Sequence, residues 1–154
     1  MRRLHLESTI TIRRPPDDVF AFTIDMFNSP RVRSMTLASR VVTPGPLGIG
    51  SVAEQRVVIL GFETHLRFTV MEWDPPHRVT ASMSGPLLRS GRVRTEMTAT
   101  SEGTRKVTTL DLELTNVGLL LRPLMGPMLR RDQARADRQQ KELLEESLSD
   151  IVAG

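Results

Sequence analysis

The sequence has no cysteine, no tyrosine and only one tryptophan among its 154 residues. The lack of cysteine excludes disulfide bonds, thiolate metal sites and a cysteine nucleophile, and it fits a cytoplasmic protein. The shortage of aromatic side chains leaves little surface on which nucleic-acid bases could stack. The 21 basic and 18 acidic residues are scattered along the chain without a basic stripe. We therefore expect no nucleic-acid partner.

Long hydrophobic runs are missing as well. The longest run in the last third of the chain, Val117 to Leu121, is far shorter than the roughly 20 residues that a membrane-spanning helix needs. The first seven residues are basic and lack the apolar stretch of a signal peptide. We expect a cytoplasmic protein with no stable membrane insertion.

Groups that could hold a metal or a phosphate are sparse. His5, His65 and His77 do not pair with carboxylates at the spacings typical of metal ligands. The glycine-containing loop at residues 44–50 precedes a predicted strand, so it lacks the helix dipole that phosphate sites use. No Ser-His-Asp order is present. We expect no metal, no cofactor and no assignable catalytic residue.

Alternation of apolar and polar residues predicts most of the secondary structure. Residues 4–13 alternate with a period of two, as a half-buried strand does. Pro16 suits a first helical turn, and Asp17 and Asp18 favour the positive end of the helix dipole, so a helix is predicted over 16–26. A second short helix is predicted over 29–34. Further strands are predicted at 37–43, 51–60, 62–73, 78–84, 92–100 and 104–115, followed by a helix from about 118 to 150.

This order of elements indicates an α+β fold in a single domain, residues 1–154. Strands joined by tight turns predict an antiparallel sheet of about seven strands, with one face wet and the other packed on the last helix. That helix has only the sheet to pack on. A sheet that curves around one long helix tends to leave a hollow between them. We expect the hollow to hold a hydrophobic small molecule.

Several segments occur in an order that is typical of one superfamily. They are Thr9 to Phe22, the loop from Pro44 to Ser51, Val70 to Arg78, the turn from Gly103 to Thr108, and the C-terminal helix. With these segments the chain resembles the START-like, or SRPBCC, superfamily, and it is most similar to the polyketide cyclase/dehydrase and lipid-transport branch.

The resemblance implies the helix-grip fold, in which a curved seven-stranded antiparallel sheet wraps around a long C-terminal helix with two short helices after the first strand. It also implies a deep cavity for lipids, sterols or polyketides, without a catalytic residue shared by all members. One segment departs from the pattern. Many relatives carry a tryptophan after the second short helix, where residues 30–35 read Pro-Arg-Val-Arg-Ser-Met here.

Strand and helix periodicity together select the candidate ligand contacts. Alternation places several apolar side chains on the inner face of the sheet, and counting 100° per residue places a stripe of the last helix opposite them. The eight candidate ligand-binding residues are Phe22, Phe68, Met83, Met97, Leu112, Met125, Met128 and Asp132. Methionine suits a pocket wall because its thioether adapts to varied shapes, although ordinary core packing explains these methionines equally well.

Asp132 and Gln139 interrupt the otherwise apolar or small stripe of the last helix. An inward carboxylate needs a partner. Asp132 is therefore either an anchor or proton-transfer group for a ligand, or it pairs with an arginine or lies at the cavity mouth.

Charged residues are predicted to gather on the outer face of the sheet. The set is Glu54, Arg56, His65, Arg67, Arg92, Arg94, Glu96, Asp111 and Glu113. The simplest interpretation is a lattice of solvated cross-strand ion pairs. A bulge or a one-residue phase error would instead turn Arg92 or Arg94 inward toward an anionic ligand. Residues 52–59 show no clean phase, so the sequence leaves this choice open.

Three classes of function remain on the sequence alone. The favoured one is a non-catalytic binder or carrier of a hydrophobic molecule such as a lipid or polyketide. The alternative is an enzyme of the polyketide cyclase, aromatase or dehydratase type, which would need a paired acid and base at the cavity. A regulatory interaction domain would show a collapsed cavity and an exposed apolar patch. Whether the chain forms a homodimer stays open.

Overall fold

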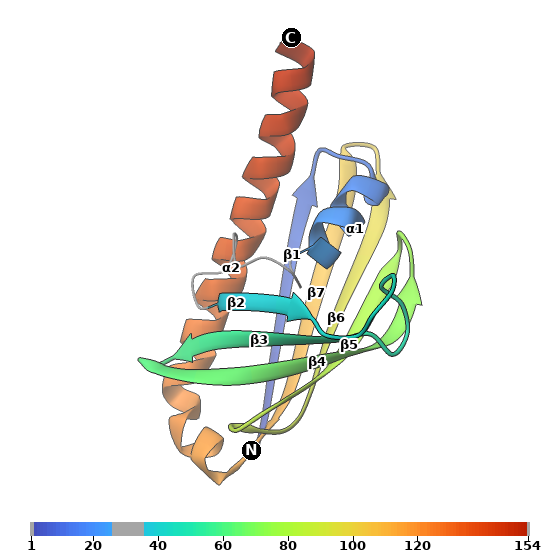
Figure 1. Cartoon of the computed structure of the whole chain (residues 1–154). Helices are drawn as coiled ribbons and strands as arrows, with labels where there is room; N and C mark the ends of the chain where they lie inside the picture. The colour runs from blue at the N-terminus through green and yellow to red at the C-terminus, as the bar shows by residue number, and fades with distance from the viewer. Residues whose placement is uncertain (1, 26–35, 154) are drawn as a thin grey trace.

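The computed structural model describes residues 2–25 and 36–153. The elements are β1 (Arg3–Ile12), α1 (Pro16–Asp25), β2 (Thr36–Val41), β3 (Val52–Ile59), β4 (Phe62–Asp74), β5 (Arg78–Gly85), β6 (Leu88–Thr100), β7 (Gly103–Leu114) and α2 (Asn116–Ala153) (Figure 1). The second short helix predicted over 29–34, and the segment 30–35 that departs from the superfamily pattern, lie outside the described residues.

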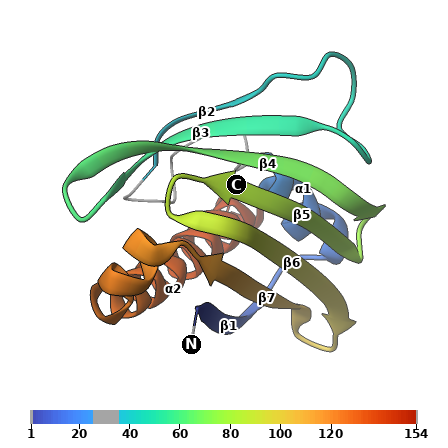
Figure 2. The same cartoon turned by 90° about the horizontal axis from the view of Figure 1, so that it is seen from below.

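All seven strands form one antiparallel sheet in the order β1-β7-β6-β5-β4-β3-β2. Each strand pairs with its sequence neighbour, except that β1 returns to lie beside β7. The accumulated right-handed twist curves the sheet, and Figure 2 shows it arching over α2. The predicted curved sheet around a long C-terminal helix, with a short helix early in the chain, is confirmed.

The helix α1 begins where its sequence favours a helix. Pro16 occupies its first position, and Asp17 and Asp18 lie in its first turn. The Arg14 guanidinium pairs with Asp18 at 2.7 Å and donates to the Leu144 carbonyl of α2 at 3.0 Å. These contacts fix the start of α1 against the C-terminal half of α2.

The long helix α2 runs alongside the edge strand β1 in the same direction, as Figure 1 shows. Side chains bridge the two elements in step along their length. Ser8 hydrogen-bonds Asp137, the Lys141 ammonium donates to the Thr11 carbonyl at 2.7 Å, and the Arg13 guanidinium pairs with Glu145 at 3.3 Å.

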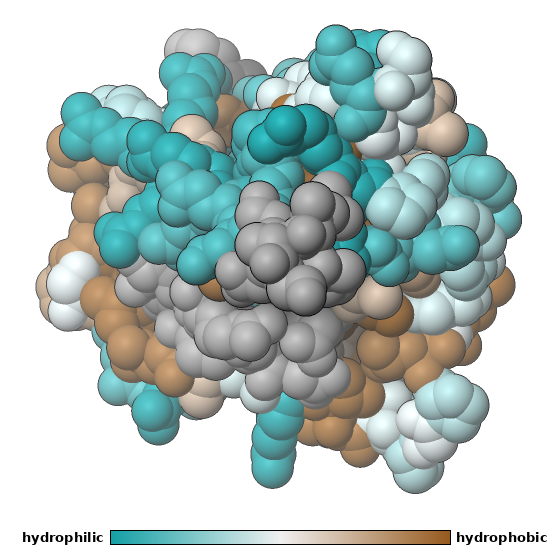
Figure 3. All heavy atoms as spheres, turned by 90° about the horizontal axis from the view of Figure 1, so that it is seen from above, coloured by the Kyte–Doolittle hydropathy of each residue, from teal (hydrophilic) through white to brown (hydrophobic). Residues whose placement is uncertain are grey.

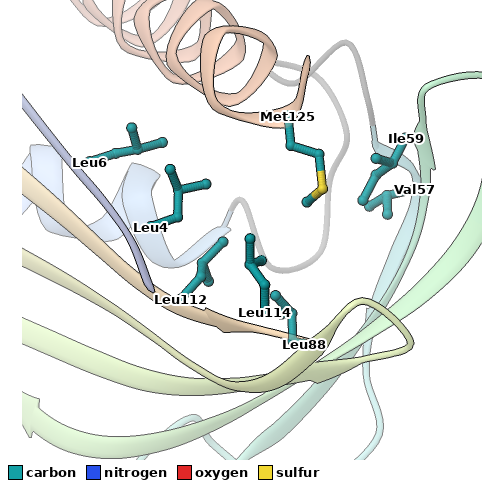
Figure 4. Close-up of a cluster of buried hydrophobic side chains, with 8 residues drawn as sticks. All are labelled: Leu4, Leu6, Val57, Ile59, Leu88, Leu112, Leu114 and Met125. Carbon is teal, nitrogen blue, oxygen red and sulfur yellow. The ribbon is translucent and has the colours of Figure 1, made fainter. Parts of the chain in front are cut away.

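Two apolar clusters lie at opposite ends of the space between sheet and helix. The lower cluster, drawn in Figure 4, consists of Leu4, Leu6, Val57, Ile59, Leu88, Leu112, Leu114 and Met125. The upper cluster consists of Ile12, Val19, Phe20, Val70, Val79, Met97 and Leu144. The Phe20 and Trp73 rings meet edge to face beside the upper cluster, with centroids 5.3 Å apart. Burial of these side chains is the main favourable contribution to folding.

The clusters divide each inner strand into three parts. Along β7, Leu114 and Leu112 belong to the lower cluster, and Leu110 and Thr108 line the space beyond it. Along β6, Leu88 belongs to the lower cluster and Met97 to the upper one, with Val93 and Thr95 between them. The middle of the sheet therefore faces α2 across a space that neither cluster fills.

Large apolar side chains are also exposed at separate places on the surface. Ile49, Phe62 and Leu120 are the most exposed, at 73%, 77% and 80%. Figure 3 views the molecule from above and shows hydrophilic residues mainly toward the top of the view and hydrophobic residues along its left and lower margins. Phe62 directly follows the tight turn at Leu60 and Gly61, both of which have positive φ.

Candidate functional site

A partly enclosed cavity of about 150 Å³ lies between α2 and strands β3 to β7. Its apolar lining residues are Val57, Ile59, Leu66, Phe68, Val79, Ala81, Met83, Val93, Leu110 and Leu129. Its polar lining residues are Thr23, Gln55, Thr95, Lys106, Thr108, Asp132 and Gln133. A cavity of this volume accommodates a molecule about the size of one aromatic ring.

Strand register separates the wall into an apolar end and a polar end. Leu110 pairs with Val93, and Val93 pairs with Ala81, which gives an apolar row across β7, β6 and β5. The next inward row pairs Ser8 with Thr108, and Thr108 with Thr95. Since inward side chains repeat every second residue, Lys106 follows Thr108 on β7. The hydroxyl and charged groups of β6 and β7 therefore lie toward one end of the cavity, where Val79 of β5 continues their row, while Gln55 is a polar residue beside Leu66 toward the other end.

A buried polar network lies beside the polar end, and we define it as Ser8, Thr23, Lys106, Gln133, Asp137 and Gln140. The Lys106 ammonium contacts the Asp137 carboxylate at 3.3 Å and the Gln140 side-chain oxygen at 2.5 Å. The Ser8 hydroxyl and the Gln133 amide also donate to Asp137. The Gln140 amide donates to the Thr23 hydroxyl at 3.0 Å.

The network joins β1, β7, α1 and α2 around one ion pair. The side chains of Lys106 and Asp137 are 2% and 4% exposed. Charges at that depth persist when they are paired and their remaining hydrogen-bonding groups are used. Gln140 is completely buried, and the Thr23 hydroxyl donates in turn to the Val19 carbonyl at 2.7 Å. The network therefore holds the last helix in register with the sheet, and one of its members, Lys106, lines the cavity.

The Thr108 hydroxyl differs from the members of the network. Thr108 is 5% exposed and lines the cavity, yet its Oγ1 has no hydrogen-bond partner among the described residues. Leaving a buried hydroxyl unsatisfied costs roughly 1–3 kcal/mol. Thr108 thus places beside the cavity a hydroxyl that has no partner in the described part of the chain.

The structure brings three of the eight candidate ligand contacts together at the cavity. Phe68 and Met83, which face each other across β4 and β5, line it, and so does Asp132 from α2. Asp132 is 7% exposed. The predicted interruption of the helical stripe by an inward carboxylate is therefore observed at Asp132.

The other five candidates lie outside the lining. Met97 is buried in the upper cluster, and Phe22 packs against it. Leu112 and Met125 are buried in the lower cluster, and Met128 packs against it. Met97, Leu112, Met125 and Met128 do lie between the sheet and α2. They do not line the cavity, because the inner face of the sheet extends beyond it.

Sequence reasoning missed Lys106, Thr108 and Gln55. Lys106 and Thr108 share the phase of Leu110 and Leu112 on β7, so the alternation predicts that their side chains point inward. They were not selected as candidates because they are polar. Gln55 lies between the buried residues Ala53 and Val57 on β3. Because Gln55 is a polar residue on the inner face, residues 52–59 show no regular alternation of apolar and polar side chains.

The buried stripe of α2 also differs from the predicted one. Asp137, Gln140 and Leu144 are buried, whereas Gln139 is half-buried and Leu143 is 39% exposed. Buried residues recur every fourth position at Asp132, Ala136, Gln140 and Leu144. Because four residues exceed one helical turn, the line of contact rotates gradually around the helix. The twist of the sheet that α2 follows accounts for this rotation.

The charged residues of the outer face form cross-strand ion pairs, as the simplest interpretation predicted. Arg94 pairs with Glu72 at 3.1 Å, and Arg92 is exposed. Neither arginine lines the cavity. The Arg67 guanidinium lies 2.8 Å from Glu54, and this hydrogen bond lowers the pKa of the glutamate from its usual value.

Residues 3–148 match the model of a protein family described as polyketide cyclase / dehydrase and lipid transport. None of the curated protein sequences matches the chain. No helix within residues 2–25 and 36–153 is long and apolar enough to cross a membrane.

Solved structures of low sequence identity share the fold. A START superfamily protein from Mycobacterium smegmatis superposes with a TM-score of 0.75 at 16% identity, over 91% of this chain and 98% of that one. The Zhui aromatase/cyclase from Streptomyces sp. R1128 gives a TM-score of 0.64 at 19% identity, over 98% and 90%. A protein from Thermus thermophilus gives 0.75 at 21% identity, over 94% and 98%. At these identities the similarity establishes the architecture alone.

Proposed function

The chain belongs to the polyketide cyclase / dehydrase and lipid transport family, and we propose that it binds a hydrophobic small molecule in the cavity between sheet and helix. In this proposal the chain acts as one ligand-binding domain that carries or sequesters its ligand. The observation that carries the proposal is the cavity itself, because ten of its seventeen lining residues are apolar. A collapsed interior, which a pure interaction domain would have, does not fit this observation.

The volume limits the ligand and its affinity. A single-ring compound that buries about 200 Å² gains at most about 5 kcal/mol at ~25 cal/mol/Å², before the costs of association. Hydrocarbon burial alone therefore supports a dissociation constant no lower than about 0.2 mM. Tighter binding requires contributions from the polar end of the cavity.

A substitution on the sheet side of the cavity can test this proposal by filling the cavity. Ala81 lies on β5, is 1% exposed and lines the cavity, so Ala81→Leu places extra carbon atoms inside it. We expect the wild-type protein to bind toluene or benzene in solution NMR titrations, and Ala81→Leu to weaken binding at least tenfold. Native mass spectrometry of the gently purified protein, showing a retained adduct, would support the proposal independently.

The matched control is Ala99→Leu, at an exposed position of β6, which should bind like the wild type. Overpacking at Ala81 costs about 1–3 kcal/mol, so the milder Ala81→Val serves if the leucine variant unfolds. The proposal fails if the wild type binds neither probe, or if the Ala81 and Ala99 variants bind equally well.

One observation favours a cyclase as the second candidate function. Asp132 and Lys106, an acidic and a basic residue, both line the same cavity. A carboxylate could remove a proton next to a ketone, and a cationic donor could stabilise the resulting enolate oxygen. The probe 2,6-heptanedione would then cyclise to 3-methylcyclohex-2-enone with loss of water. Turnover by the wild type that Asp132→Asn abolishes supports this candidate, and background rates for both proteins exclude it.

A further inference from the structure

We propose that the cavity selects a compact neutral ligand that carries a hydroxyl or carbonyl oxygen, and that this oxygen binds to the Thr108 hydroxyl. The hydrocarbon part of the ligand then lies against Phe68, Met83 and Leu110. This inference rests on the proposed binding function and adds to it the chemistry and the orientation of the ligand.

The wall of the cavity is uneven in polarity. Thr108, Thr95 and Lys106 lie on neighbouring inward positions of β6 and β7. Gln133 lines the same space from α2 while it donates to Asp137, so the polar parts of sheet and helix meet at one end. A ligand with polarity at one end and hydrocarbon at the other matches this division.

The Thr108 hydroxyl makes no observed hydrogen bond within the described part of the chain. Thr108 lines the cavity, and its buried Oγ1 lacks a partner among the described residues. A threonine hydroxyl both donates and accepts, so it can satisfy either an alcohol or a carbonyl oxygen. A ligand oxygen at this position removes the cost of the unsatisfied group, whereas a pure hydrocarbon leaves that cost in place.

The charged groups of the cavity wall favour a neutral ligand. Among the described lining residues, Lys106 and Asp132 are the charged ones. The Lys106 ammonium already has Asp137 as an ion-pair partner and Gln140 as an acceptor. The positive charge of Lys106 is thus already balanced by Asp137. A carboxylate ligand would add a buried negative charge that this ion pair does not balance, which is unfavourable. A neutral oxygen adds none.

Three single-ring probes separate these alternatives. Phenol and toluene have the same number of heavy atoms and differ in the hydroxyl, and benzoate adds a negative charge. We expect the wild type to bind phenol more tightly than toluene, and toluene more tightly than benzoate, in NMR or calorimetric titrations.

The deciding variant is Thr108→Val, which preserves the shape of the side chain and removes its hydroxyl. It should weaken phenol binding about fivefold, the usual value of one hydrogen bond, and leave toluene binding unchanged or slightly stronger. Thr108→Ser should retain the preference for phenol. The control is Thr98→Val, at an exposed position of β6, which should change neither affinity.

Folding should survive the deciding substitution, because valine suits a strand and no observed hydrogen bond of the Thr108 side chain is lost. Equal binding of phenol and toluene by the wild type, or an equal loss of both in Thr108→Val, overturns the inference while the proposed binding function stands. Tighter binding of benzoate than of phenol also overturns it. If the wild type binds neither phenol nor toluene, the proposed function itself fails.

Discussion

The long helix α2 is attached to the sheet in two different ways along its length. Near its start, Met125 packs into the lower cluster among leucines of β1, β6 and β7. Twelve residues further on, Asp137 belongs to the polar network that is centred on Lys106. The cavity lies between the two attachments.

The two attachments contribute differently to the fold. Apolar burial adds stability in proportion to area and has little directional preference. An ion pair with its hydrogen bonds demands one geometry, and its net contribution is small unless one partner is removed. The lower cluster therefore supplies stabilising free energy, whereas the polar network fixes the position of α2 along β1. A helix held at both ends in this way can span a cavity without collapsing into it.

The largest effect is expected from breaking the polar network at Asp137. In Asp137→Ala the Lys106 ammonium stays buried without its ion-pair partner, and Ser8 and Gln133 each lose an acceptor. We expect a loss of about 3–5 kcal/mol in the free energy of unfolding, measured by urea denaturation.

The control replaces both charges. Lys106→Met combined with Asp137→Leu removes the unpaired charge and should recover part of the stability lost in Asp137→Ala, although Ser8, Gln133 and Gln140 still lack the partners they have in the wild type. A single variant that loses less than about 1 kcal/mol would show that the network does not constrain α2, and it would remove the contrast between the two attachments.

A smaller and more graded effect is expected at Met125 in the lower cluster. Met125 is 2% exposed, so Met125→Ala should cost about 2–5 kcal/mol in urea denaturation, toward the lower end if the cluster relaxes. Met125→Leu keeps the volume and should cost less than about 1.5 kcal/mol. The neighbouring Leu124 is 61% exposed, and Leu124→Ala should change stability little. Equal losses at Met125 and Leu124 would contradict the assignment of this helix face.

The same contrast explains how much of the fold the sequence could predict. The strands were recognisable because apolar residues such as Leu4, Leu6 and Leu112 alternate with polar ones, and tight turns implied antiparallel neighbours. The return of β1 to the edge beside β7 is not encoded in any local pattern. This pairing was therefore not among the predictions.

The candidate site was less predictable because its distinguishing residues are polar on a buried face. A search for inward apolar residues found Phe68 and Met83 but passed over Thr108 and Lys106 on the same face of the sheet. On α2, Asp132 was identified as inward, yet the network member Gln140 was missed by one position because the buried stripe rotates around the helix. Which inward residues reach a cavity depends on where the clusters end, and that requires the three-dimensional packing.

The smallest effect is expected at an attachment between β1 and β7 on the outer face, where solvent screens the charges. The Asp111 carboxylate accepts a hydrogen bond from the exposed His5 ring at 2.5 Å, and this raises the pKa of His5 above its usual value. The folded state binds the proton more tightly, so the contribution of the pair is present in full below the unfolded pKa of about 6.5 and is lost as the pH rises through the folded pKa.

An NMR titration of His5 should show the raised pKa, and Asp111→Asn should return it toward its usual value. The melting temperature of the wild type should fall slightly relative to that of His5→Gln between pH 6 and pH 8, and 1 M salt should reduce the difference. A pKa of His5 at or below its usual value would exclude the pair, and a pH dependence as large as the loss in Asp137→Ala would mean that exposed and buried charge pairs in this protein do not differ as their burial implies.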